Sequence, residues 1–183
     1  LAEQHGLIAE LGDRVFDQVL RHLVRWRQQG LATVPVAINF SAAQFHRPGM
    51  VGRIESALVR HAIDASLIEI ELTESILIQN VESVLATVQR LKNLGIQLSI
   101  DDFGTGYSSL SYLKRFHIDK LKIDQSFVRD VTQDADDKAI VLAIIQMAKS
   151  LNLKTIAEGV ETQAIADLLH SYQCDEAQGY HFA

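Results

Sequence analysis

The sequence has few of the features that mark secreted or membrane-spanning proteins. Its single cysteine, Cys174, allows no disulfide within the chain, which fits a reducing compartment. No apolar run approaches the roughly 20 residues of a membrane span, and no segment has the pattern of a signal peptide. We therefore expect a cytoplasmic protein, or the cytoplasmic part of a larger and even membrane-anchored one, with no membrane contact from these residues.

The sequence also lacks a surplus of basic residues. It holds 17 Lys and Arg against 23 Asp and Glu, which gives a formal net charge of -6. A general nucleic-acid binder needs a basic face, so we expect neither DNA nor RNA as a partner. An acidic protein can still act on a phosphodiester when bound metal ions reverse the local field.

Short and long segments alternate along the chain. The composition, 48% hydrophobic and 22% charged over 183 residues, is that of one globular domain. Near-continuous apolar runs rich in β-branched residues are typical of parallel strands buried on both faces. Such runs predict strands at Val34–Phe40, Leu67–Thr73, Ile96–Asp101, Lys120–Asp124, Leu153–Ala157 and Ala177–Phe182.

Between these runs the apolar residues recur with helical spacing. Gly30 and Gly95 follow two of the expected helices, where a left-handed C-cap is wanted. The helical stripes are Leu11, Val15, Val19 and Leu23; Val81, Val84, Leu85, Val88 and Leu91; and Ile140, Val141, Ile144, Ile145, Ala148 and Leu151. One helix, about five strand–helix units and a last strand predict an α/β fold with a parallel sheet.

Two parallel architectures fit this order of elements. An open doubly wound sheet usually carries a glycine-rich phosphate loop after its first strand. The stretch Asn39-Phe40-Ser41-Ala42, which follows the first expected strand, is not such a loop. We therefore predict a β/α barrel and keep the doubly wound sheet as the alternative.

Polar residues gather near the ends of the expected strands, and in β/α barrels that rim holds the active site. A single acidic residue there more often caps a helix or faces solvent. A shared pattern on successive strands indicates a common site, because burying several carboxylates together without cations costs many kcal/mol. The residues in question are Asn39, Glu69, Glu71, Asp101, Asp102, Lys122, Asp124, Glu158 and Gln178.

The donor atoms of this set predict a divalent-metal site. Oxygen-only ligands such as Asn39, Glu71, Asp101 and Glu158 suit Mg²⁺, Mn²⁺ or Ca²⁺. The neighbours Asp101 and Asp102 could serve two ions. A lysine in an apolar strand, Lys122, could orient a water or take charge from a phosphate oxygen.

Six blocks of the sequence resemble the EAL domain family, the bacterial phosphodiesterases that linearise cyclic di-GMP. The resemblance covers essentially the whole chain, and the second, third and fifth blocks are highly specific in combination. The blocks are Asn39-Phe40-Ser41, Glu71-Leu72-Thr73-Glu74-Ser75, Asp101-Asp102-Phe103-Gly104-Thr105-Gly106-Tyr107-Ser108-Ser109-Leu110, Lys120-Leu121-Lys122-Ile123-Asp124, Ala157-Glu158-Gly159-Val160-Glu161 and Gln178-Gly179-Tyr180.

The resemblance implies a modified TIM-type (β/α) barrel. It also implies an active site that binds two metal ions, Mg²⁺ or Mn²⁺, and an activity that Ca²⁺ inhibits. By resemblance, the metal ligands are Asn39, Glu71, Asp101, Asp102 and Glu158, with Asp102 serving the second ion. Lys122, Glu158 and Asp102 carry the catalytic roles, and Lys122 positions the attacking water. Substrate-binding or supporting roles fall to Gln178, Asp124, Glu161, Thr73 and Glu74, the last two as anchors of the Asp101–Leu110 loop.

The chain departs from the family pattern at its start. The family's Glu-Ala-Leu signature, whose glutamate is a metal ligand, would lie before residue 1, and Glu176-Ala177-Gln178 does not replace it. We therefore expect residues 1–183 to be a partial EAL-type domain, without the first strands and clipped at its C-terminal end. Our hypothesis is that the parent protein has the missing parts and is active, whereas residues 1–183 alone lack one metal ligand and are not expected to be active by themselves.

The resemblance implies that the domain hydrolyses cyclic di-GMP to linear pGpG. It also implies a homodimer formed through the Asp101–Leu110 loop and the helix after it. The alternatives are a catalytically inactive domain that senses cyclic di-GMP, a purely structural or partner-docking domain, and a barrel hydrolase for another phosphodiester. A degenerate sensor would be expected to have lost several of the polar residues that are all present here.

Overall fold

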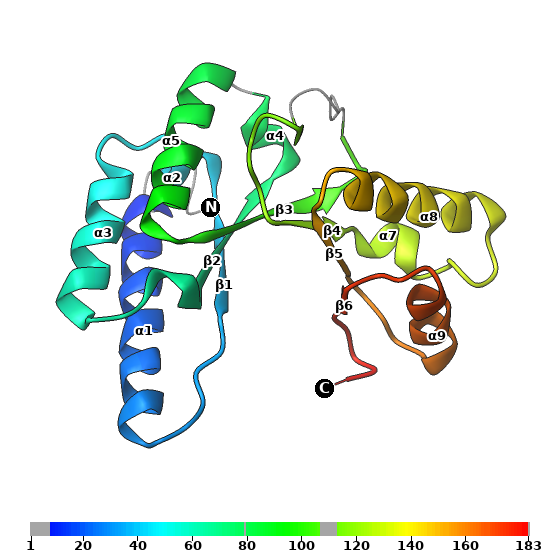
Figure 1. The fold of residues 1–183 in the computed structure, drawn as a ribbon, viewed down its shortest axis with the longest axis horizontal. Helices are drawn as coiled ribbons and strands as arrows, with labels where there is room; N and C mark the ends of the chain where they lie inside the picture. Colours follow the sequence, from blue (N-terminus) through cyan, green and yellow to red (C-terminus); the bar gives the residue numbers. More distant parts are fainter. Residues whose placement is uncertain (1–7, 79, 107–112, 183) are drawn as a thin grey trace. The chain divides into compact units, whose positions relative to one another are not determined.

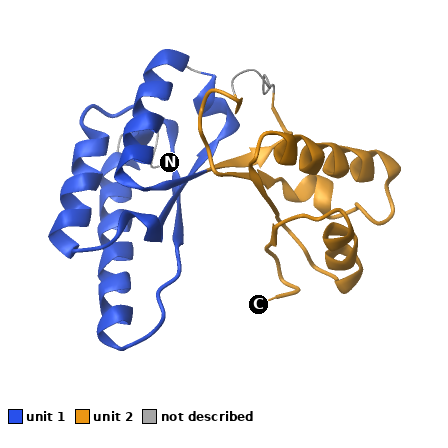
Figure 2. Cartoon of the chain, in the orientation of Figure 1, with its two compact units in different colours: residues 1–98 blue, residues 99–183 orange. Residues whose placement is uncertain are grey.

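Helices and strands alternate along the chain (Figure 1). The computed structural model describes residues 8–78, 80–106 and 113–182. Two compact units, residues 1–98 and residues 99–183, make up the chain (Figure 2). The strands are β1 (Val36–Phe40), β2 (Ile68–Thr73), β3 (Gln97–Phe103), β4 (Lys120–Ile123), β5 (Lys154–Ala157) and β6 (Glu176–Ala177).

The helices differ widely in length. Those of three turns or more are α1 (Ile8–Gln28), α3 (Met50–His61), α5 (Val81–Leu94) and α8 (Ala135–Ser150). The shorter ones are α2 (Ala42–Phe45), α4 (Glu74–Leu77), α7 (Gln125–Val128), α9 (Gln163–Ser171) and the 3-10 turn η1 (Ala65–Leu67). Within the described ranges no helix is both long enough and apolar enough to cross a membrane.

The strands follow one another in the sheet in the order of the sequence, from β1 to β6. Every pairing whose register is described, β1–β2, β3–β4, β4–β5 and β5–β6, is parallel. A doubly wound sheet reverses its strand order at a switch point, and this order has no reversal over the described residues. The predicted α/β class with a parallel, barrel-type strand order is therefore confirmed; among the described strands the order is open, with β1 and β6 at its ends.

In unit 1, residues 1–98, the core lies between the strands and the long helices. The side chains of Ile68, Ile70 and Leu72 on β2 are fully buried. Helix α1 packs against β1 and α3, and α3 packs against α5 (Figure 1). Gly95 adopts a left-handed conformation as the C-cap of α5, as predicted.

The buried face of α1 is not the stripe that the sequence predicts. Leu11 and Val15 are 49% and 42% exposed, whereas Phe16 and Leu20 are buried. Leu23, which the stripe includes, is buried as well. The stripe is wrong over its first turns because spacing alone does not decide which of two apolar rows a helix turns toward the sheet.

In unit 2, residues 99–183, helix α8 covers the strands β4 and β5. All four residues of β4 are buried, which is the pattern expected of a strand with both faces covered. The α8 side chains of Val141, Ile144 and Ile145 are buried as predicted, and Ile140 is 37% exposed.

The last strand is shorter than predicted. The expected range was Ala177–Phe182, but β6 ends at Ala177. Beyond it the chain turns around Val160, whose N–H donates to the Gln178 carbonyl at 3.0 Å and whose carbonyl accepts from the His181 N–H at 3.0 Å. Gly179 lies so close to the Val160 backbone that a Cβ atom would collide with it. The residues after Ala177 therefore pack against the backbone of Val160 and do not continue the strand.

Candidate functional site

Three carboxylates meet at the carboxyl ends of strands in unit 2. Asp101 and Asp102 lie at the end of β3, and Glu158 directly follows β5. One oxygen of each carboxylate lies within 4.8 Å of an oxygen of the other two. They meet because β3, β4 and β5 are parallel neighbours, which brings their carboxyl ends to the same edge.

Lys122, on β4 between those strands, bridges two of the carboxylates. Its ammonium Nζ lies 2.8 Å from Asp101 Oδ1 and 2.7 Å from Glu158 Oε1. The lysine side chain is only 6% exposed, so its charge is largely removed from water. A buried charge is tolerated when partners of opposite sign surround it, and here Lys122 offsets the negative charge of both carboxylates.

Asp102 occupies an unusual backbone conformation, with φ at +54°. The β3–β4 register shifts between Ile100 and Phe103, so the strand is irregular where Asp102 lies. Partial burial raises the pKa of Asp102, and the charges of Asp101, Asp124 and Glu158 raise it further. A bound cation would offset the repulsion between Asp102 and the neighbouring carboxylates.

Asp124 belongs to the same group of acids. It is the N-cap of α7, and its Oδ1 accepts a hydrogen bond from the Ser126 N–H at 2.9 Å. Burial alone would raise the pKa of Asp124, but the hydrogen bonds that its carboxylate accepts from Ser126, Asp102 and the Gln125 N–H outweigh it and lower the pKa. Asp124 is therefore close enough to Asp102 for its charge to raise the pKa of that residue.

The segments that follow β5 and β6 lie beside each other. The Glu158 N–H donates to the Ile123 carbonyl at 3.2 Å, and the Gln178 N–H donates to the Ala157 carbonyl at 2.8 Å. These bonds bring the backbone of Gln178 next to the residue that precedes Glu158. The side chains of Gln178 and Glu161 are exposed.

The remaining predicted residues lie in unit 1. Asn39 on β1 and Glu71 on β2 are register partners at the carboxyl ends of their strands. Asn39 is exposed, whereas Glu71 is 7% exposed. The strand pairing therefore brings these two predicted ligands together, as it does the acids of unit 2.

Thr73 and Glu74 stand at the junction of β2 and α4. Thr73 is the N-cap of α4, and its hydroxyl lies 3.1 Å from the Ser75 hydroxyl. Glu74 is 5% exposed, and within the described residues neither of its carboxylate oxygens has a hydrogen-bond partner. Their predicted anchoring of the Asp101–Leu110 loop involves residues 107–110, which lie outside the described residues.

One ion pair close to this site was not predicted. Lys120 lies two residues before Lys122 on β4, and its Nζ is 2.6 Å from Glu176 Oε2 on β6. Next to it, Asp175 accepts hydrogen bonds from the N–H and the hydroxyl of Thr155 at 2.8 and 3.1 Å. These contacts tie β6, a strand of only two residues, to β4 and β5. The signal in the sequence was a second lysine in a buried strand, on the same face as Lys122.

Comparisons with known proteins identify the family. The family model described as "EAL domain" matches residues 1–183. The bifunctional diguanylate cyclase/cyclic di-GMP phosphodiesterase MucR of Pseudomonas aeruginosa is 43% identical over 180 residues, which cover 98% of this chain and 26% of MucR. The cyclic di-GMP phosphodiesterase PdeR of Escherichia coli is 42% identical over 182 residues, which cover 100% of this chain and 27% of PdeR. The chain thus spans about a quarter of the length of these relatives.

Solved structures agree with this result. A structure described as the PaMucR phosphodiesterase in complex with c-di-GMP superimposes with a TM-score of 0.95 at 42% identity, covering 100% of this chain and 74% of that one. The EAL domain of Mycobacterium smegmatis DcpA superimposes with a TM-score of 0.88 at 37% identity, covering 95% of this chain and 78% of that one.

Proposed function

The chain belongs to the EAL domain family, and from this we propose that the protein is a metal-dependent phosphodiesterase that hydrolyses cyclic di-GMP to linear pGpG. The observation that carries the proposal is the cluster of Asp101, Asp102 and Glu158, with Lys122 between two of them. Relatives named as cyclic di-GMP phosphodiesterases, at 42–43% identity, support the substrate.

The donor set fits a divalent cation. Three carboxylate oxygens within 4.8 Å of one another are hard ligands of the kind that Mg²⁺ and Mn²⁺ prefer. When bound, such an ion would act as a Lewis acid: it would stabilise negative charge on the phosphoryl oxygens and lower the pKa of a water bound to it. In the proposal the metal ligands are Asp101, Asp102 and Glu158, together with the predicted ligands Asn39 and Glu71.

Lys122 supplies the positive charge that belongs to the chain itself. Its ammonium is nearly buried beside the carboxylates of Asp101 and Glu158, so a water at this cluster would lie within reach of a charged hydrogen-bond donor. A buried ammonium also stabilises negative charge that develops on the phosphodiester, since its field is weakly screened. We assign Lys122 the role of orienting the attacking water.

Asp124, Gln178 and Glu161 have supporting roles in the proposal, as do Thr73 and Glu74. Asp124 lies close enough to Asp102 for its charge to raise the pKa of that carboxyl, and so adds to the negative charge that a bound cation would offset. Homodimerisation through the Asp101–Leu110 loop and the following helix, inhibition by Ca²⁺ and a cytoplasmic location also remain proposals.

Replacing Lys122 by Ala in the full-length protein tests the role of this residue. We expect pGpG formation to fall by about 10²–10³-fold, the usual cost of removing a preorganised charge from a catalytic site. Lys154→Ala, which removes an exposed lysine at the start of β5, is the matched control and should leave the rate within about twofold, as for a solvated surface charge. Undiminished hydrolysis by the Lys122 variant would refute the assignment.

A domain that binds cyclic di-GMP without cutting it is the competing function. Binding and hydrolysis are separated by measuring both on the same protein, with calorimetry for the complex and chromatography for pGpG. Tight binding with no product in Mg²⁺ or Mn²⁺ would favour the sensor.

A further inference from the structure

A cavity of about 470 Å³ lies within unit 1, between α1 and the α2–α3 segment. Pockets for small ligands occupy roughly 300–1,000 Å³, so this volume is in the usual range. Its wall includes Phe40, the residue after Asn39, and successive residues of a strand point to opposite faces. The cavity therefore lies on the other face of β1 from the Asn39 side chain. We call it the arginine cavity, after Arg47, Arg53 and Arg60, which line it.

One side of the arginine cavity is apolar. Phe16 on α1, Phe40 at the end of β1, and Met50 and Ile54 on α3 contribute to its lining and are each 4–6% exposed. Such a wall suits the apolar body of a ligand, because contact with it removes apolar surface from water.

The acids that line the cavity are already engaged. Asp13 Oδ2 accepts from Arg47 Nη1 at 2.7 Å. Asp17 is bound by His61 Nε2 and by Arg21 Nη2, each at 2.8 Å. The hydrogen bond from His61, together with the charge of Arg21, lowers the pKa of Asp17, so this carboxylate is ionised and paired at neutral pH.

Arg53 and Arg60 are engaged only loosely with the same acids. Arg53 Nε lies 3.8 Å from Asp13 Oδ1, and Arg60 Nη1 lies 3.8 Å from Asp17 Oδ1. Both distances exceed the length of a hydrogen bond. Arg53 Nη1 donates to the Pro48 carbonyl at 2.9 Å, but its buried Nε has no hydrogen-bond partner in the described part of the chain. A buried donor without an acceptor is costly and calls for an explanation.

Gly52 keeps the cavity open. It lies in the first turn of α3 and lines the cavity, and a Cβ atom built on it would meet no atom within 4 Å. Its φ angle is not in the left-handed region, so neither backbone conformation nor crowding requires glycine there. Glycine disfavours helix formation, by up to about 1 kcal/mol relative to alanine in a helix interior. A side chain at this position would fill part of the cavity.

We propose that the arginine cavity binds a small organic phosphate. The phosphate accepts hydrogen bonds from Arg53 and Arg60, and the apolar body lies against Phe16, Phe40 and Met50. Two loosely engaged guanidiniums match the double negative charge of a phosphate monoester, and the planar guanidinium is suited to bidentate contact with phosphate oxygens. The proposal is independent of the phosphodiesterase function, because none of these residues belongs to the metal-capable cluster.

Calorimetric titration of the protein with phenyl phosphate, in excess EDTA to keep metal ions out of the acidic cluster, tests the proposal. We expect one binding site, with affinity at least about tenfold above that for inorganic phosphate, since burial of the ring adds to the charge contacts. Phenol, which has the ring without the charge, should bind more weakly than phenyl phosphate. Equal affinity for phenyl phosphate and inorganic phosphate, or no binding of phenyl phosphate, would overturn the proposal and show that the ion pairs serve only to tie α1 to α3.

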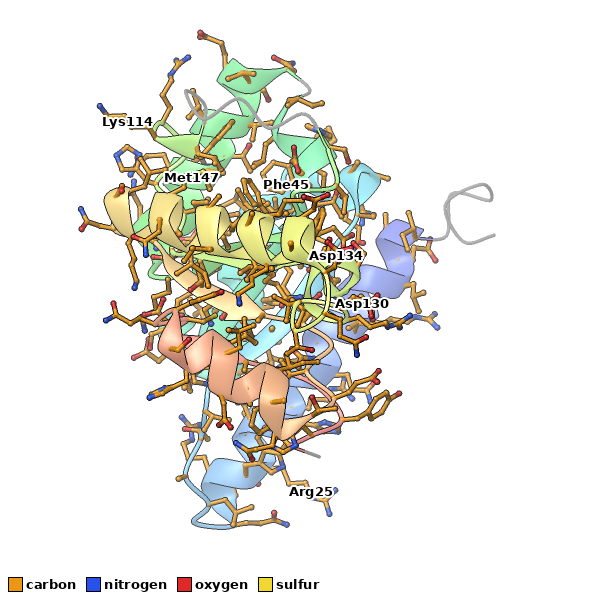
Figure 3. All side chains as sticks on the ribbon, turned by 90° about the vertical axis from the view of Figure 1, so that its right-hand side faces the viewer. Arg25, Phe45, Lys114, Asp130, Asp134 and Met147 are labelled. Carbon is orange, nitrogen blue, oxygen red and sulfur yellow. The ribbon has the colours of Figure 1, made fainter. Side chains whose placement is uncertain are left out.

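Two variants and one control locate the binding. Gly52→Leu should fold with an unchanged or higher melting temperature, because the position offers space and leucine favours helix, and should lose affinity for phenyl phosphate by at least about tenfold. Arg53→Gln should lose affinity to a similar extent through the lost charge–phosphate contact. Arg25→Gln removes an exposed arginine of α1 that does not line the cavity and should bind as the parent protein does (Figure 3). Wild-type affinity in either Gly52→Leu or Arg53→Gln would refute the location.

Discussion

Asp17 shows how one residue joins two helices of unit 1. Its carboxylate, on α1, accepts from His61 at the end of α3 and from Arg21 one turn along α1. The side chain is 26% exposed, so water screens these contacts only in part. The pKa of Asp17 is lowered because these contacts, above all the hydrogen bond from His61, stabilise the ionised carboxylate in the folded state.

The stability of the protein should therefore depend on Asp17 in a pH-dependent way. Because the folded-state pKa lies below the unfolded one, the stabilisation is fully present above the unfolded value and is lost as the pH falls through the folded value. Asp17→Asn should lower the free energy of unfolding by about 1 kcal/mol at pH 7, and the difference should shrink below about pH 4. Urea unfolding of the parent protein and the Asp17 variant, from pH 7 to below about pH 4, measures this difference in the free energy of unfolding. A difference that becomes larger below about pH 4 would contradict a lowered pKa of Asp17 in the folded state.

The sequence predicted single site residues only where a polar residue stands at or near the end of an apolar run. Asp101, Asp102, Lys122 and Glu158 were found because each stands at or near the end of a buried run, and neighbouring parallel strands bring such ends together. No comparable pattern in the sequence predicts the arginine cavity. Its residues come from α1, α2, α3, the loop between α2 and α3, and the end of β1, and their meeting depends on which face of α1 turns inward.

At the scale of elements, α8 begins at a side-chain cap. The Oδ1 atom of Asp134 accepts from the N–H groups of Asp136 at 2.7 Å and Asp137 at 3.1 Å, which otherwise lack partners within the helix. Helix α8 covers β4, the strand that carries Lys122.

Removing this cap should destabilise α8. We expect Asp134→Ala to lower the free energy of unfolding by about 1 kcal/mol, the usual loss for an N-cap. Asp130→Ala is a matched control, since Asp130 is an exposed acid shortly before the helix and not its cap (Figure 3). Thermal or urea unfolding compares the two variants; equal stability would show that solvent replaces the cap without loss.

Elements were predicted best where burial on both faces leaves a continuous apolar run. The expected Leu67–Thr73 and Leu153–Ala157 agree with β2 and β5 to within one residue. The apolar run at the C-terminal end was assigned wholly to a strand, although Gly179 brings it against Val160 and ends the ladder at Ala177. Apolarity indicates burial, but it does not distinguish a strand from a turn held by a close backbone approach.

At the scale of the whole molecule, the sequential order of parallel strands accounts for the spread of the predicted site residues along the sequence, from Asn39 to Gln178. Each strand delivers its polar residue at its carboxyl end. The structure shows this within each unit, for Asn39 with Glu71 and for Asp101 with Glu158. The α/β class with a parallel sheet could be predicted from alternation alone, whereas the pairing of Lys120 with Glu176 could not, since it joins strands that are not neighbours.

The most direct measurement of the proposed activity is the metal dependence of cyclic di-GMP hydrolysis. The full-length protein is incubated with cyclic di-GMP in Mg²⁺ or Mn²⁺, in Ca²⁺, and in each with excess chelator, and pGpG is quantified by chromatography. We predict pGpG in Mg²⁺ or Mn²⁺ and none in Ca²⁺ or chelator, because Asp101, Asp102 and Glu158 act by holding the metal. Turnover that persists in chelator, or substrate left intact in Mg²⁺ and Mn²⁺, would contradict a metal-dependent phosphodiesterase.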